Sequence, residues 1–132
     1  MLARREALAA GYDAVVDGWD GVSRQLRPAT RNDGRHALHL YAVVVDPESV
    51  AVSRDHLVAA LRAENIGVAV HYEAIHRQPY YAGSLGARDE DLPGASRIGS
   101  WTISLPLSPD MTDGHVSDVL AATEKILGHY RR

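Results

Sequence analysis

The sequence predicts an α+β fold: a small, mainly antiparallel three-stranded sheet with helices packed on one face, flanked by amphipathic helices at both ends of the chain. Three observations support this class. Segments with helical periodicity occupy both ends, three short β-type segments lie between them, and glycines and prolines separate the segments. The 132 residues fit a single domain, residues 1–132.

The N-terminal segment is predicted to form a helix over residues 2–17, which Gly18 and Gly21 end. Residues 20–36 are polar and are predicted to form a loop. A loop of this length is unusual inside a compact domain, so we expect a segment outside the chain to pack there. Five apolar side chains form one stripe along the predicted helix: Leu8, Tyr12, Val15, Val16 and Trp19.

The middle of the chain is predicted to hold two strands with a helix between them. Residues 36–46 alternate in strand fashion and carry apolar side chains on both faces, which is typical of a central strand. Ser53 is a suitable N-cap for a helix over residues 54–64. Gly67 suits the left-handed position that closes such a helix. A second, short strand is predicted over residues 67–72.

The C-terminal half is predicted to hold a short helix, the third strand and a long amphipathic helix. Residues 73–91 are broken by prolines and glycines, so at most a helical turn is expected there. A short helix over 93–101 leads into a strand over 102–105. Thr112 or Asp113 caps the last helix. Its apolar stripe is the clearest periodic signal in the chain and comprises Val116, Val119, Leu120, Ile126, Leu127 and Tyr130, with the hydroxyl of Thr123 free to bond back by one turn.

Composition and charge exclude several functional classes. Apolar residues make up 45% of the chain and charged residues 23%, which is typical of a globular domain. Without cysteine the chain has neither disulfides nor thiolate metal sites. A net charge of −3 and the lack of a basic stripe argue against nucleic acid, and no apolar run is long enough for a membrane span. We therefore expect a cytoplasmic protein without nucleic-acid or membrane partners.

The densest polar cluster follows the predicted strand at 67–72. It contains His71, Tyr72 and His76, with Arg77 beside them. All four side chains can donate hydrogen bonds, so together they could bind a phosphate or a sugar hydroxyl. The alternative is a surface loop in which the tyrosine packs and the histidines are solvated.

Metal-dependent and nucleophilic chemistry have little support. Neither His36 with His39 nor His71 with His76 supplies the three or four converging ligands that zinc requires. The chain has no Gly-x-Ser-x-Gly motif and no glycine-rich phosphate loop. No metal site is therefore predicted.

Several short motifs follow one another in a specific order. They are Arg4-Arg5-x-x-Leu8-Ala9-x-x-Tyr12, Leu40-Tyr41-Ala42-Val43, Arg54-x-x-Leu57-x-x-x-Leu61, Asn65-Ile66-Gly67-Val68, His71-Tyr72, His76-x-Gln78-Pro79-x-Tyr81 and Ser104-Leu105-Pro106-Leu107. In this order they resemble the C-terminal domain of the DegT/DnrJ/EryC1/StrS family of aminotransferases. These are enzymes of fold type I that depend on pyridoxal phosphate (PLP) and mostly aminate keto groups on nucleotide-linked sugars.

The resemblance implies a role for the polar cluster. His71 and Tyr72 are expected to lie near the substrate sugar and its phosphates, and His76 to line the same mouth. The chain has Glu73-Ala74 where a proline is common in the family. A carboxylate at this position is expected to repel a sugar diphosphate, because like charges repel.

The resemblance also implies a cofactor that the chain alone is not expected to hold. Residues 1–19 correspond to an interdomain helix and residues 36–132 to the small domain, whereas the lysine that binds PLP belongs to the large domain. The sole lysine, Lys125, borders the apolar stripe of the last helix and is expected to be a surface side chain. No PLP is therefore expected on this chain alone. Whether the chain is a fragment, the product of a truncated gene or half of a split enzyme stays open.

Two functions remain in contention. The chain is either the small domain of a nucleotide-sugar aminotransferase, inactive when isolated, or a non-catalytic nucleotide-sugar-binding or protein-interaction module derived from that fold. The expected partners are a large PLP-binding domain or subunit and a nucleotide sugar. A domain that docks on a larger one exposes an apolar contact surface, so we also expect a homo-oligomer, with Tyr12, Val16 and Trp19 as candidate contacts. A ferredoxin-like RNA-binding role is disfavoured by the charge.

Overall fold

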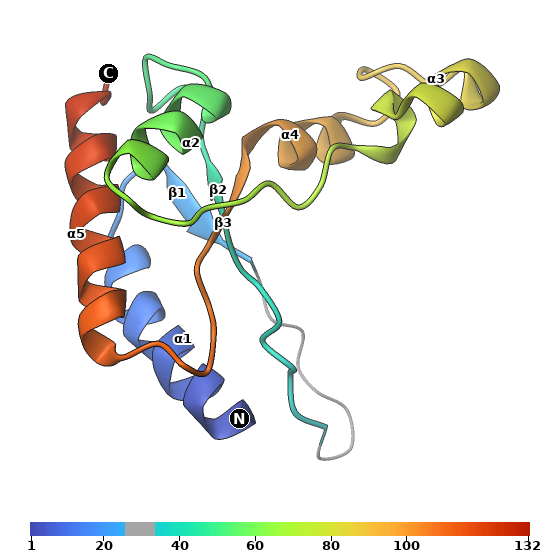
Figure 1. Ribbon diagram of the computed structural model, residues 1–132. Helices are drawn as coiled ribbons and strands as arrows, with labels where there is room; N and C mark the ends of the chain where they lie inside the picture. The colour runs from blue at the N-terminus through green and yellow to red at the C-terminus, as the bar shows by residue number, and fades with distance from the viewer. Residues whose placement is uncertain (26–33) are drawn as a thin grey trace.

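The computed structural model describes residues 1–25 and 34–132 and confirms the α+β class (Figure 1). A three-stranded antiparallel sheet lies beside the helices α1, α2 and α5, and α3 and α4 extend away from this body. The elements in chain order are α1 (Leu2–Val16), β1 (Val22–Arg24), β2 (Tyr41–Val45), α2 (Arg54–Ala63), the 3-10 turn η1 (Ile75–Arg77), α3 (Pro79–Leu85), α4 (Pro93–Trp101), β3 (Thr102–Leu105) and α5 (Asp113–His129).

The central strand β2 carries the core of the sheet, as predicted for this segment. Its residues Tyr41, Val43 and Val45 are buried, and β1 and β3 pair with it on either side. The predicted start at residue 36 is wrong, because Leu38 has a positive φ of 46° and so interrupts the extended backbone. Pairing begins only at Tyr41, which lies opposite Leu105.

The third strand of the sheet is β1, which lies inside the segment predicted to be a loop. Val22 lies opposite Val45 in its three-residue ladder, which is too short to show alternation in the sequence. The predicted strand over 67–72 instead makes a single bridge, between Ala69 and Ser104. Residues 26–33 of the predicted loop, and the packing expected against them, lie outside the described part of the chain.

The predicted helices over residues 54–64 and after Thr112 are confirmed as α2 and α5, including their N-caps. The Ser53 and Thr112 side chains accept hydrogen bonds from the third residues of α2 and α5, and the Thr123 hydroxyl donates to the Val119 carbonyl at 2.7 Å. The left-handed residue after α2 is Asn65, with φ of 63°, and not Gly67 as predicted. Asparagine tolerates this conformation better than most residues, so it ends the helix two positions earlier.

The first helix packs against the chain's own body, which corrects the expectation that its apolar stripe is uncovered. Tyr12 and Val16 are fully buried and Trp19 packs against the same core. The helix α1 lies along α5, so the two ends of the chain close the core together (Figure 1). The Tyr12 hydroxyl donates to the Pro106 carbonyl at 2.9 Å, and burial raises the pKa of this phenol.

The helices α3 and α4, with η1, form an arm that projects from the body (Figure 1). The helix α3 is longer than the single turn predicted for residues 73–91, because Pro79 at its first position starts it and Gly86, in the left-handed conformation, ends it. None of the helices in the described residues is long and apolar enough to cross a membrane.

Candidate functional site

The segment 69–74 carries two of the predicted site residues, His71 and Tyr72, and is hydrogen-bonded to β3. Ala69 and Ser104 exchange both backbone hydrogen bonds, at 3.1 and 2.8 Å. Two residues later, His71 Nδ1 lies 2.9 Å from the Ser104 hydroxyl. The segment therefore lies along the edge of β3 that β2 leaves free, and the Ser104 side chain meets the His71 ring there.

His71 and Tyr72, which the sequence predicts to contact a substrate, lie side by side. Their rings meet edge to face with centroids 5.0 Å apart. The peptide bond between them is cis. Tyr72 is 73% exposed and His71 is half-buried, so both present polar atoms at the surface. The two side chains therefore offer a phenol and an imidazole to a ligand at this surface.

Close packing of backbone on backbone holds this segment against α4. Gly99 is buried, and a Cβ added there would lie 2.7 Å from the backbone nitrogen of Ala74. Arg54, at the start of α2, reaches the same end of α4, where its Nη1 donates to the carbonyl of Gly99 at 3.1 Å. Its side chain is nearly buried, and it pairs a carbonyl that α4 leaves without a helical partner.

His76 lies apart from His71 and Tyr72, inside the base of the arm. It is 4% exposed, and its Nε2 lies 2.9 Å from Asp89 Oδ1 and 3.0 Å from Ser96 Oγ. Because a carboxylate only accepts, the hydrogen on Nε2 is donated to Asp89. The serine and the carboxylate therefore meet the same ring nitrogen, which leaves no base for the serine hydroxyl. This trio ties η1 to α4 and is not a nucleophilic triad.

Arg77 pairs with two acidic residues at the base of the arm, Asp89 and Glu73. Its guanidinium binds Asp89 with two hydrogen bonds, at 2.8 and 2.6 Å, and reaches Glu73 at 3.2 Å. This guanidinium, and then the hydrogen bond from His76, hold the pKa of Asp89 well below its usual range, and Asp89 in turn raises the pKa of Arg77. The repulsion expected from Glu73 is therefore reduced by an adjacent cation.

An open groove of about 430 Å³ lies between the start of α2, the segment at Glu73 and the end of α4, and neither His71 nor Tyr72 lines it. Arg54 at the start of α2 and Arg77 at the base of the arm border it, and each is already paired with a carboxylate of the same lining, Asp55 and Glu73 respectively. The groove therefore holds paired charges of both signs. The groove is lined by Ser53, Arg54, Asp55, Glu73, Arg77, Ser100 and Trp101.

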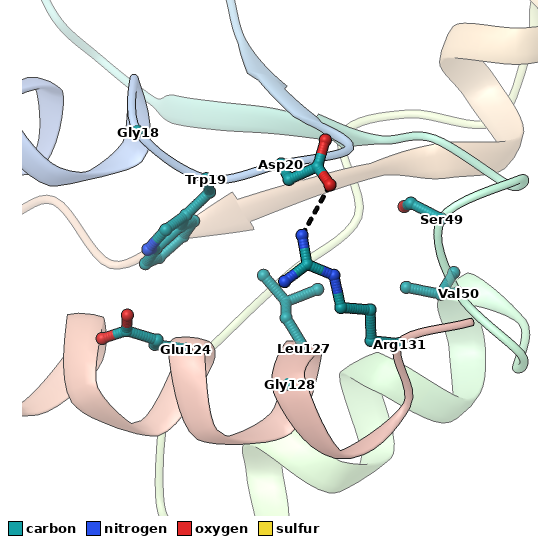
Figure 2. A pocket seen from close by; sticks show the side chains of 9 residues that line it. All are labelled: Gly18, Trp19, Asp20, Ser49, Val50, Glu124, Leu127, Gly128 and Arg131. Atoms are coloured by element: carbon teal, nitrogen blue, oxygen red, sulfur yellow. Dashed lines mark hydrogen bonds and ion pairs between the residues drawn. The ribbon is translucent and has the colours of Figure 1, made fainter.

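A second pocket, of about 190 Å³, lies between residues 18–20, residues 49–50 and the end of α5, and shares no lining residue with the groove (Figure 2). Trp19 and Leu127 form its apolar wall, and Arg131 crosses it to pair with Asp20 at 2.5 Å. Arg131 and Asp20 satisfy each other's charge. We therefore interpret this pocket as a gap where the two ends of the chain pack together. Among the described residues, no three histidine or acidic side chains gather as a metal site.

Lys125 lies on the outer surface of α5, as predicted. Its side chain is 68% exposed, and its Nζ lies 2.8 Å from Glu64 Oε1. It lines neither the groove nor the pocket. An exposed, paired amine has none of the enclosure that a Schiff-base lysine requires.

Sequence reasoning missed the residues that support the site. Ser104 and Gly99 act through contacts with residues 33 and 25 positions away, which no local pattern reports. The one available signal for Ser104 is its place on a strand predicted to be buried, where a polar side chain needs a partner. Asp89 and Ser96 carry no comparable signal.

The chain matches known proteins along almost its whole length. The sequence profile described as the DegT/DnrJ/EryC1/StrS aminotransferase family matches residues 1–124. The spore coat polysaccharide biosynthesis protein SpsC of Bacillus subtilis is 38% identical over 96% of this chain and 32% of its own length. The UDP-4-amino-4-deoxy-L-arabinose–oxoglutarate aminotransferase of Shewanella sediminis is 32% identical over 96% of this chain and 33% of its own.

Solved structures show the same likeness. The crystal structure of S. venezuelae DesV in complex with a ketimine intermediate has a TM-score of 0.77 at 29% identity and covers 95% of this chain and 31% of DesV. The chain thus spans about a third of the length of the relatives it matches. The chain belongs to the DegT/DnrJ/EryC1/StrS family of PLP-dependent sugar aminotransferases, and it corresponds to one part of their full-length members.

Proposed function

We propose that this chain supplies the C-terminal small domain of a nucleotide-sugar aminotransferase and contributes substrate contacts and interdomain packing. The observation that carries the proposal is the His71-Tyr72 pair, in which Ser104 of β3 holds the half-buried His71 and Tyr72 is exposed. The motif containing this pair lies within the family match over residues 1–124.

The cofactor chemistry belongs elsewhere in this proposal. The residues present do not fit PLP, because Lys125 is exposed on α5 and paired with Glu64. A large PLP-binding domain, on the same polypeptide or on a separate subunit, would supply the lysine and the cofactor pocket. The described residues would then bind and orient the sugar nucleotide and exclude water from one side of it.

His71 and Tyr72 would contact the ligand directly in this arrangement. An imidazole and a phenol both donate hydrogen bonds to phosphate or sugar oxygens, and Arg77 lowers the local negative charge. His76 is buried against Asp89 and Ser96, so it would act by holding the arm in place. The predicted role of His76 as a direct ligand contact remains a prediction.

Titration calorimetry with a UDP-linked amino sugar tests the substrate contact. We expect measurable binding to the chain and a loss of about 5–20-fold in affinity for His71→Ala, the effect of one charge-assisted or neutral hydrogen bond in a partly exposed site. His129→Ala, at an exposed histidine on α5, is the matched control and should bind like the parent. Equal affinities in the parent and His71→Ala would refute a substrate role for His71. Absence of any binding would favour the alternative of a protein-interaction module.

The arm carries the apolar surface that docking would cover. Large apolar side chains exposed by 42–79% concentrate between residues 72 and 98, and the list comprises Tyr72, Ile75, Tyr80, Tyr81, Leu92 and Ile98. Exposed apolar groups gathered on one projecting element are typical of a contact surface. We propose that the large PLP-binding domain covers this surface, and that two copies of the isolated chain associate through it.

Sedimentation velocity over a range of concentrations tests this docking surface. The double variant Tyr80→Ser/Ile98→Ser should stay monomeric at concentrations where the parent chain associates, because it removes two apolar side chains that are 79% and 56% exposed. Val15→Ser, at an exposed position on α1, is the matched control and should associate like the parent. A parent chain that is monomeric throughout, or a double variant that associates equally, would rule out the arm as the contact.

A further inference from the structure

The buried hydroxyl of Ser104 contacts His71, and the proposed substrate role of His71 does not account for this contact. It is 3% exposed on β3, and its Oγ lies 2.9 Å from His71 Nδ1. Within the described part of the chain, this imidazole nitrogen is the only hydrogen-bond partner of the Ser104 hydroxyl. The other ring nitrogen, Nε2, has no partner there and is not buried.

The burial of Ser104 decides which group donates. If His71 Nδ1 carried the hydrogen and Ser104 accepted it, the serine's own hydrogen would be buried without an acceptor, which is unfavourable. If the hydroxyl donates to a bare Nδ1, both groups are satisfied and the hydrogen of the neutral ring lies on Nε2. No other described residue competes, because neither ring nitrogen contacts a carboxylate.

We propose that Ser104 is a positioning residue that selects the tautomer of the neutral His71 ring, with the hydrogen on Nε2, so that His71 presents a donor to the ligand. The partner of such a donor is an acceptor oxygen, of a phosphate or of a sugar hydroxyl or carbonyl. His71 then orients the substrate by donation and does not act as a general base. The ligand part of this inference rests on the proposed function, and the tautomer part does not.

The backbone supports this assignment. Ala69 and Ser104 exchange hydrogen bonds two residues before His71, so the distance between the serine and the imidazole is set by the bridge and not by a free loop. Close contact between Gly99 and Ala74 fixes the segment on its other side. The ring is thus constrained at both flanks, which is what a preorganised contact requires.

The ¹⁵N resonances of the two ring nitrogens, measured on the labelled chain without ligand, test the tautomer. The His71 signals are assigned by their loss in His71→Gln. At a pH where the ring is neutral we expect Nε2 to be protonated and Nδ1 to show the shift of a hydrogen-bonded acceptor. In Ser104→Ala the Nδ1 signal should move towards that of a free acceptor, and in Ser104→Thr it should stay. A protonated Nδ1 in the parent, or a Nδ1 signal indifferent to Ser104→Ala, overturns the proposal.

Binding of the UDP-linked amino sugar separates this inference from the proposed function. Ser104→Ala should weaken binding by about 3–10-fold, the effect of one lost hydrogen bond, while Ser104→Thr restores it. Ser117→Ala, on the exposed side of α5, is the control and should leave affinity unchanged. If the resonances follow the expected pattern but no sugar nucleotide binds the parent, the positioning of His71 stands and the proposed substrate fails. If the sugar binds and Ser104→Ala leaves its affinity unchanged, the positioning role fails alone.

Discussion

Replacing Gly99 with alanine is expected to disturb the candidate site from a distance, because the added methyl group has no room. An ideal Cβ at this position lies 2.7 Å from the backbone nitrogen of Ala74 and 3.0 Å from its Cβ. Backbone atoms cannot rotate away as a flexible side chain can, so α4 or the 69–74 segment must shift by several tenths of an ångström. A shift of that kind moves Ala74 and, three residues earlier, His71.

The expected change in the free energy of unfolding of Gly99→Ala is the sum of two opposing contributions. Overpacking of this kind costs about 1–3 kcal/mol. Alanine in place of glycine within a helix recovers about 0.5–1 kcal/mol. The net expectation is a loss of about 1–2 kcal/mol in the free energy of unfolding, or a fall of roughly 3–10 °C in Tm for a domain of this size.

Gly94→Ala provides the matched control within the same helix. A Cβ there meets nothing within 4 Å, so only the helix-propensity gain remains and stability should hold or rise slightly. Urea unfolding compares both variants with the parent, and calorimetry with the UDP-linked amino sugar reports the site. A Gly99→Ala chain as stable as Gly94→Ala, with unchanged affinity, would refute the close-packing argument.

Three further outcomes are expected. Tyr12→Phe should lower the free energy of unfolding by about 1–2 kcal/mol in urea, because it leaves the buried Pro106 carbonyl without its donor, whereas Tyr81→Phe should not. The pKa of Asp89 is depressed in the folded chain, so its contribution to the arm is complete above its ordinary pKa of 3.8 and is lost as pH falls through the folded value. Amide exchange in α4 should therefore rise below pH 3.8 in the parent more steeply than in an Asp89→Asn chain, and equal slopes would contradict this. Mixed with one equivalent of PLP, the chain should show no visible absorbance of an internal aldimine, and a stable absorbance of that kind that disappears in Lys125→Arg would refute a lysine supplied from elsewhere.

The sequence was sufficient for those elements whose signal is local. The stripe on α5, the Ser53 and Thr112 caps and the strand β3 depend on neighbours within one or two turns, and the structure has them where periodicity predicts them. The strand β1 was missed because three residues cannot display alternation. The predicted strand at 67–72 has the right composition and lies at the free edge of β3, but only Ala69 forms a ladder pair there, an extent of pairing that local composition does not report.

The candidate site, too, could be predicted only in part from the sequence. Adjacency in sequence does not by itself bring His71 and Tyr72 together, because successive side chains of an extended segment point to opposite sides, and the structure brings the two rings into contact with Tyr72 exposed. The position of His76 could not be foreseen, because its burial depends on Asp89, 13 residues away on the far side of α3. A local cluster of polar residues thus separates into two groups, one exposed and one internal, through contacts that only the fold supplies.

This division bears on how the domain would work inside a larger enzyme. The arm is fixed by buried and bidentate polar contacts within the chain, among His76, Arg77, Asp89 and Ser96, and not by its exposed apolar side chains. Docking on a large domain would therefore cover a surface that is already ordered, and little of the binding free energy would be spent on ordering side chains. The same rigidity keeps His71 in place before a substrate arrives. In the proposed enzyme, the arm's polar base and its apolar surface would therefore have separate roles, the first holding the arm in place and the second contacting the large domain.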